Sequence, residues 1–139
     1  MELTIKTTKH NELIDITEQV KSFIKDSKTE EGICSIFPMH TTTGIMINEN
    51  EERLLEDMKE FLEQLAPINK KYKHDDIEKR NCPEDEPKNG HAHLKTILSG
   101  NSVTIPISKG ELQLGTWQSI FLCEYDGPRT RTVILKILH

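Results

Sequence analysis

The sequence predicts an α+β fold with a mostly antiparallel, sandwich-like β core that carries two to three helices. Short stretches that alternate apolar and polar side chains, or apolar runs closed by Gly or Pro, occur near both ends of the chain. Two stretches between them carry apolar residues at helical spacing. The length suits one domain, which we assign to residues 1–139.

The first third of the chain predicts strands around one short helix. Residues 3–8 have the period of a half-buried edge strand. Residues 14–24 switch to helical spacing, with Thr17 as the helix N-cap. The apolar runs at 32–37 and 44–47 are predicted as two further strands.

The most regular helix is expected over residues 54–65, whose apolar side chains share one face. Asn48 or Asn50 caps it, and acidic residues follow in its first turn. Pro67 ends it. Residues 68–90 are polar and rich in breakers, and so long a loop is typically functional or disordered.

The last third predicts a short helix over 94–98, with Asn89 as a possible cap and Gly100 as its stop. Four consecutive antiparallel strands are expected after it, at 102–106, 111–114, 116–124 and 130–138. The final strand carries apolar side chains on both of its faces, so we expect a helix layer or another subunit to bury them.

Composition limits the classes of function. A formal charge of −5 disfavours nucleic acid as the main partner, because phosphate binding needs a basic face. No membrane span or signal peptide is visible, so a cytoplasmic protein is expected. The three cysteines form no CxxC pair, and Cys34 and Cys123 lie in apolar runs typical of buried, inert thiols.

Histidines supply the candidate site. His40, His74 and His93 each neighbour a polar group that is expected to orient the ring: Thr41 or Thr42, Asp75 and Asn89, respectively. Three imidazoles can hold zinc with one position open for water or substrate. His91 and His93 would point to opposite sides of a regular helix, so one ion would not take both. The spacing is not diagnostic, because surface or hydrogen-bonded histidines give the same pattern.

The order of short motifs resembles the YjbQ family, whose name often carries the label secondary thiamine-phosphate synthase. The resemblance runs over nearly the whole chain, and Gly-Thr-Trp-Gln is its most specific part. The motifs are His40-Thr41-Thr42, Asn48-Glu49-Asn50, Tyr72-Lys73-His74-Asp75, Asn89-Gly90-His91-Ala92-His93-Leu94-Lys95, Gly100-Asn101-Ser102 and Gly115-Thr116-Trp117-Gln118.

This resemblance implies a compact α+β fold assembled as a homotrimer, with sites near the subunit boundaries. His40, His74 and His93 match the family's histidines. The implied activity is a weak thiamine-phosphate synthase reaction, which joins a pyrimidine methyl diphosphate to a thiazole phosphate with loss of diphosphate. The partner would then be a small phosphorylated molecule.

Anion contacts in such a reaction are expected from Thr41, Thr42, Arg129 and Arg131. The ligands and the reaction favour different divalent metals. Three imidazoles favour zinc, whereas diphosphate chemistry normally uses magnesium.

Two other classes of function fit the same residues. One is a metal-dependent hydrolase or lyase in which Asp75 or Glu49 moves the proton. The other is a non-enzymatic trimer that binds a metal or metabolite.

Overall fold

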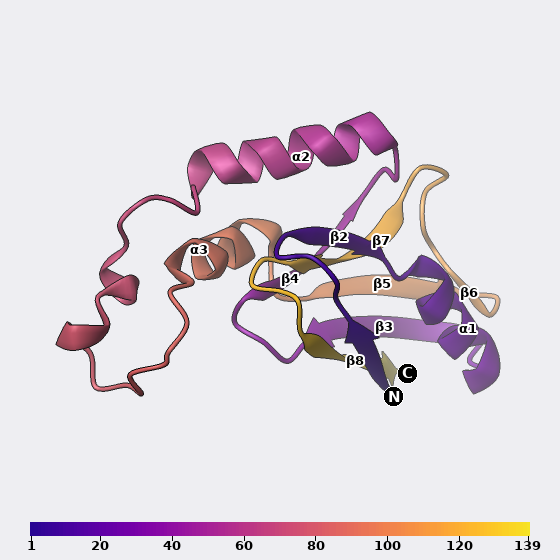
Figure 1. Ribbon diagram of the computed structural model, residues 1–139. Helices are drawn as coiled ribbons and strands as arrows, with labels where there is room; N and C mark the ends of the chain where they lie inside the picture. The colour runs from indigo at the N-terminus through magenta and orange to yellow at the C-terminus, as the bar shows by residue number, and fades with distance from the viewer.

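The computed structural model describes residues 1–139 and confirms the α+β class (Figure 1). Eight antiparallel strands form two sheets, with the orders β1-β8-β3-β5-β6 and β2-β7-β4. The strands are β1 (Glu2–Lys6), β2 (Glu12–Asp15), β3 (Glu31–Pro38), β4 (Thr43–Asn48), β5 (Val103–Ser108), β6 (Glu111–Leu112), β7 (Ser119–Glu124) and β8 (Thr130–Leu138).

Three α-helices complete the fold: α1 (Thr17–Ser27), α2 (Glu52–Leu65) and α3 (Gly90–Ser99). Two single 3-10 turns, η1 (Lys73–Asp75) and η2 (Ile77–Lys79), lie in the long polar loop. Figure 1 shows α2 and α3 on the side of the three-stranded sheet that faces away from β3 and β8. None of these helices is long and apolar enough to cross a membrane.

Strand β7 packs against both the five-stranded sheet and the helix layer, because successive side chains of a strand point to opposite faces of its sheet. Ile120 and Leu122 join the core between the two sheets, together with side chains of α1, β3, β5 and β8. Phe121 and Cys123 point the other way and pack with Leu62 of α2. Both faces of β7 are therefore buried, and the three-stranded sheet holds the helix layer in place.

The outer face of the five-stranded sheet has no helix layer, which corrects one of the two coverings predicted for the last strand. The other covering, another subunit, stays a prediction. Val133 and Leu135 of β8 are fully buried, but Lys136 is exposed. On the same outer face Ile33 and Phe37 of β3 remain 42% and 45% exposed. Within one chain, β8 is thus buried on one face only.

The predicted helix over 14–24 was placed too early. Ile14 belongs to β2, which pairs with β7, and α1 begins at Thr17. Thr17 is not the N-cap, which is Ile16. The Thr17 backbone N–H donates to Asp15 Oδ1 over 2.8 Å, so a carboxylate two residues earlier satisfies this helix end.

Asn89 is the N-cap residue of α3, as predicted, but its side chain makes no capping hydrogen bond. The side-chain caps of the other two helices therefore also differ from the prediction. The Glu51 carboxylate, not an asparagine, accepts from the N–H groups of Arg53 and Leu54 over 2.9 and 2.8 Å. Helix α3 begins at Gly90 rather than at 94, because Asp75 Oδ1 accepts the Gly90 N–H over 2.9 Å. Gly100 ends α3 as predicted.

Of the last four strands, β5 and β6 pair consecutively as predicted, but the strands after them do not. β7 and β8 lie in different sheets, and the turn at Asp126–Arg129 carries the chain from one sheet to the other. Residues 116–118 form a turn before β7, and β6 contains only Glu111 and Leu112. Cys34 and Cys123 are buried as predicted, and burial raises their pKa to about 11 and about 12, respectively.

Candidate functional site

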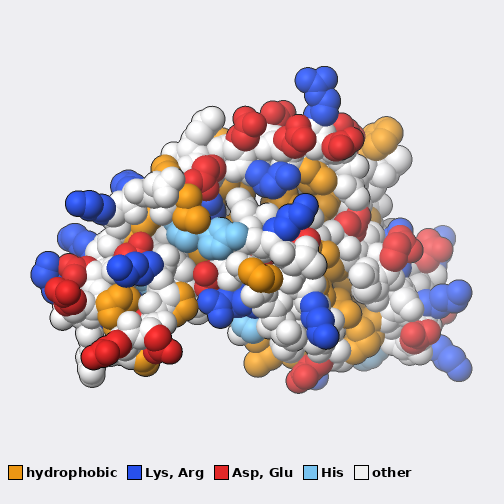
Figure 2. Space-filling model, in the orientation of Figure 1, with side chains coloured by type: hydrophobic (Ala, Val, Ile, Leu, Met, Phe, Trp, Pro, Cys, Tyr) orange, Lys and Arg blue, Asp and Glu red, His pale blue; other side chains and the backbone are white.

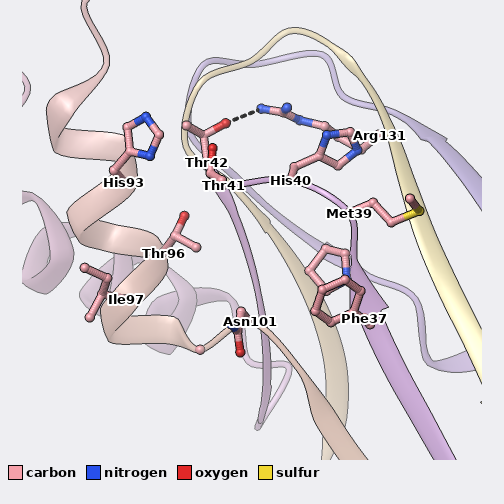
Figure 3. Close-up of a pocket in the computed structure, with 12 residues that line it drawn as sticks. Phe37, Met39, His40, Thr41, Thr42, His93, Thr96, Ile97, Asn101 and Arg131 are labelled. Carbon is pink, nitrogen blue, oxygen red and sulfur yellow. Dashed lines mark hydrogen bonds between the residues drawn. The ribbon is translucent and has the colours of Figure 1, made fainter. Parts of the chain in front are cut away.

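A cavity of about 940 Å³ opens between α3 and the connection from β3 to β4 (Figure 3). The wall formed by the connection and β8 is mostly polar and includes His40, Thr41, Thr42 and Arg131. The α3 wall carries His93 and Thr96, followed by Asn101. The apolar side chains of Phe37, Met39 and Ile97 complete the lining of the cavity.

Backbone contacts between β4 and the end of α3 fix the width of this cavity. The Ile45 N–H donates to the Gly100 carbonyl over 3.0 Å. A Cβ on Gly44 would lie 2.9 Å from that carbonyl oxygen and 1.9 Å from Ser99 Oγ, so glycine is needed for the close approach. This close approach of β4 to the end of α3 places His93 opposite Thr41 and Thr42 across the cavity (Figure 3).

Arg131 is held by a buried ion pair. Its Nε and one Nη donate to the two oxygens of Glu124, both over 2.6 Å, and the same Nη donates to Thr42 Oγ1 over 3.0 Å. Glu124 is fully buried and also accepts from Thr7 Oγ1. The second Nη of Arg131 has no protein partner among these bonds and remains as a donor for a ligand in the cavity.

His40 is a neutral hydrogen-bonding group. Its Nε2 accepts the backbone N–H of Thr132 over 2.8 Å, so the ring proton is on Nδ1. Burial lowers the pKa of His40, and the positive charge of Arg131 lowers it further. Thr132 therefore orients His40, which corrects the expectation that Thr41 or Thr42 does so.

His74 and His93 are in contact, with their ring centroids 4.5 Å apart in an edge-to-face arrangement. Burial lowers the pKa of His93, and the neighbouring His74 adds to this effect. Asn89 Oδ1 lies 3.2 Å from His74 Nε2, and Asn89 Nδ2 donates to Asp126 Oδ2 over 2.9 Å. Asn89 thus orients His74, not His93 as the sequence suggested.

Three predicted site residues have other environments. Asp75 Oδ1 accepts the Gly90 N–H at the start of α3, and Asp75 makes no hydrogen bond to His74 that would orient its ring. Glu49 follows β4 near the start of α2 and does not line the cavity. Arg129 also lies outside it, where it pairs with Asp126 over 2.8 Å.

The residues of one chain do not fit the predicted three-histidine metal site. The only lone pair of neutral His40 is occupied by the Thr132 N–H. No group of three or more His, Cys, Asp or Glu side chains is arranged to hold a metal ion. We therefore derive no chemical step through a metal.

Comparison with known proteins establishes the family. The model of the family described as UPF0047 protein YjbQ-like matches residues 1–139. The chain belongs to the YjbQ/UPF0047 family. A UPF0047 protein from Archaeoglobus fulgidus is 49% identical over 138 residues, which cover 99% of this chain and 100% of that protein. The UPF0047 protein YugU from Bacillus subtilis is 38% identical over 137 residues, covering 98% and 96%.

Solved structures have the same fold as this chain. A crystal structure from Clostridium acetobutylicum has a TM-score of 0.88 and 39% sequence identity, with 99% of both chains covered. A hypothetical protein from Aeropyrum pernix has a TM-score of 0.89 and 36% identity, covering 99% of this chain and 96% of that one. The family expectation stated from the motifs is thus confirmed for the fold.

Some cavity residues of this YjbQ-like chain were not predicted. Thr96 lies one turn after His93, and this spacing places both on one helix face, so it was a usable signal. Phe37 and Met39 carried no such signal, because exposed apolar side chains at a strand end are common.

The histidine pKa values predict how stability depends on pH. The pKa values of His40, His91 and His93 all lie below the usual 6.5, first because of burial. The unfolded chain therefore binds protons at a higher pH than the folded chain, and the unfolding free energy should fall as the pH drops below about 7. Carboxylates with lowered pKa values also reduce the unfolding free energy in acid, but only as the pH approaches and falls below their usual pKa values of 3.8 to 4.5.

Urea unfolding at a series of pH values between about 8 and 5 measures this effect. The His40→Gln variant should show a shallower decline than the parent, because one of the three histidines no longer titrates. An unfolding free energy that stays constant over this interval would contradict the prediction.

Proposed function

We propose that the cavity binds a small phosphorylated molecule and that the protein is a thiamine-phosphate synthase-like transferase. The observation that carries this proposal is the pairing of anion-binding donors with an apolar wall in one cavity. The reaction would join a pyrimidine methyl diphosphate to a thiazole phosphate. We also propose that the protein acts in the cytoplasm.

The anion would contact the free Nη of Arg131 and the hydroxyl groups of Thr41 and Thr42. Charged donors and hydroxyls are the usual partners of phosphate oxygens. Because Glu124 offsets the charge of Arg131, the donors would act mainly by position rather than by net charge. We expect moderate affinity and strong dependence on the ligand's shape.

The apolar wall suits the flat rings of both substrates. Phe37, Met39 and Ile97 line the cavity and are 45%, 55% and 74% exposed. Heteroaromatic rings would cover them and bury apolar surface, at roughly 25 cal/mol per Å². The phosphate groups would then point towards the polar wall.

The transfer needs little covalent chemistry from the protein. The bond between the methylene carbon and the diphosphate oxygen breaks with its electrons on oxygen, and the thiazole nitrogen lone pair forms the new C–N bond. The protein aligns the two substrates and stabilises the leaving diphosphate. In this proposal the neutral His93 ring donates its single N–H to the leaving oxygen.

A hydrolase or lyase is the second candidate, favoured by the His93 environment. A neutral imidazole with a lowered pKa can accept a proton from water or substrate, and the His74–Asn89–Asp126 contacts would position it. Neither Glu49 nor Asp75 is placed to be this base, since one lies away from the cavity and the other caps α3.

A divalent metal remains a separate proposal. His74 and His93 are the two predicted ligands whose rings touch, and imidazole favours zinc over magnesium. A third ligand would come from the substrate or from another copy of the chain. Elemental analysis of the parent and of His74→Ala would test this: equal metal content in both would overturn it.

The transferase proposal is tested by incubating the protein with both substrates and quantifying thiamine phosphate and diphosphate chromatographically. We expect the two products in equal amounts. Release of diphosphate without coupling would favour the hydrolase. Tight stoichiometric binding without turnover of either substrate would favour the non-enzymatic binding protein.

A homotrimer is proposed from the open face of the five-stranded sheet. Ile33, Phe37 and Leu138 are 42%, 45% and 53% exposed there, so this face presents apolar side chains that an adjacent copy would bury. Because Phe37 also lines the cavity, such an interface would place the site next to a subunit boundary.

Sedimentation velocity at micromolar concentration should give the mass of three chains. The variant Ile33→Lys/Leu138→Lys should dissociate, because it buries two charges at the interface. The matched control Lys21→Glu changes an exposed residue of α1 and should remain trimeric. A stable monomer for the parent chain would contradict the proposal.

A further inference from the structure

A closed turn at residues 115–118 presents the only tryptophan of the chain to solvent. The Gln118 N–H donates to the Gly115 carbonyl over 2.9 Å, and the Gly115 N–H donates to Gln118 Oε1 over 2.7 Å. Trp117 lies at the tip of this turn and is 72% exposed. Because its backbone is already fixed, it loses little conformational entropy when a partner covers it. Tryptophan is enriched among the residues that anchor protein interfaces.

Trp117 cannot reach the cavity of its own chain. Strand β7 begins at Ser119, directly after the turn, and ends at Glu124. Glu124 pairs with Arg131, which lines the cavity. A strand rises about 3.3 Å per residue, so the two ends of β7 are roughly 17 Å apart. Figure 1 shows the connection from β6 to β7 at one end of the three-stranded sheet and α3 at the other. A contact between Trp117 and the cavity therefore joins two copies of the chain.

We propose that Trp117 of one copy packs on the apolar rim of the cavity of the next copy and completes the binding site there. Phe37 and Ile97 form this rim, and they are 45% and 74% exposed. Two different surfaces meet in such a contact, so it is heterologous and can close into a ring of three chains. The inference rests on the proposed homotrimer and on the proposed ligand-binding role of the cavity, and it names the residue that the neighbouring copy contributes.

The charges of the two surfaces are complementary, which favours a second copy as the partner of Trp117. Asn48 pairs with the first residue of β7, next to the turn, and three of the four residues after it are acidic. Figure 2 shows Asp and Glu side chains gathered over α2, which begins there. No Asp or Glu lines the cavity, whereas Arg131 does. Lys136 is exposed on the outer sheet face that also carries Phe37.

The fluorescence of the single tryptophan tests this contact without an assay of activity. Ile97→Lys places a charge on the rim, and its Trp117 should emit further to the red and be quenched more by acrylamide than that of the parent at micromolar concentration. Leu65→Lys makes the same kind of change at a 49% exposed position of α2 outside the cavity. This control should keep the emission and the quenching of the parent.

A cysteine pair tests the same contact directly. Thr116 is the other residue at the tip of the turn, Met39 lines the cavity, and Cys82→Ser removes the one thiol that is not buried. On oxidation, Thr116→Cys/Met39→Cys should give covalent dimers and trimers on a non-reducing gel. A disulfide needs Cα atoms within about 7 Å, and the two positions are too far apart in one chain to react with each other. The control pair Thr116→Cys/Leu65→Cys should stay as single chains.

Three outcomes would overturn the inference. A trimeric parent whose Trp117 is quenched as strongly as in Ile97→Lys, and whose cysteine pair does not cross-link, would overturn it and leave the homotrimer standing. A parent that sediments as a single chain would overturn both. Cross-linking through Leu65→Cys instead of Met39→Cys would place Trp117 on α2, away from the cavity. None of these outcomes depends on turnover, so the proposed transfer reaction is tested separately.

Discussion

Replacing Glu124 by alanine is expected to lower the unfolding free energy by about 3–5 kcal/mol, the cost of breaking a buried ion pair from one side. Glu124 is fully buried, and its two oxygens accept from Arg131, from Thr7 and from two backbone N–H groups. Without the carboxylate, the Arg131 guanidinium would be left in the interior with no counter-charge. Urea unfolding of parent and variant measures the difference.

The exposed ion pair between Arg129 and Asp126 provides the matched control. Arg129→Ala removes a pair of similar chemistry and similar length, but its side chain is 42% exposed, so the expected loss is at most about 1 kcal/mol. The double variant Glu124→Leu/Arg131→Met should be more stable than Glu124→Ala, since it leaves no unpaired charge. Equal effects of Glu124→Ala and Arg129→Ala would show that burial does not govern this pair.

Local signals predicted much of the fold. The β3 and β4 strands were predicted from short apolar runs, and α2 from a single apolar face. The helical spacing also predicted that His91 and His93 separate, and they do face different partners, His10 and His74. These properties depend on residues within a few positions of one another.

Pairings between distant segments could not be predicted in this way. The Thr132 N–H that occupies His40 is 92 positions away in sequence, and nothing in either segment indicates the contact. Glu124 and Arg131 are only seven positions apart, but they lie on strands of different sheets, and a consecutive hairpin would have arranged them differently. The candidate site thus depends on the crossing between the sheets at Asp126–Arg129.

Replacing His93 by alanine is expected to lower kcat/KM of the proposed transfer by about 10²–10³-fold, the usual cost of losing one donor to a developing oxyanion. The His93 ring lines the cavity and makes no hydrogen bond to the protein that would hold it away from a ligand. His139→Gln changes the exposed last residue of the chain and should keep the parent rate. A rate in His93→Ala within about twofold of the parent would remove this residue from the mechanism.

The ratio of the parent's rate to the rate of His93→Ala, measured across pH, then distinguishes the two candidate reactions. The lowered pKa keeps His93 neutral at pH 7 and to a lower pH than an ordinary imidazole. If His93 is a base in a hydrolase, protonation removes its lone pair, and the rate ratio falls towards one as the pH drops through that lowered pKa. If His93 donates to the leaving diphosphate, the protonated ring is an equal or better donor, and the ratio is maintained or rises in acid. We expect the second result, and a ratio that falls to one would overturn the donor role.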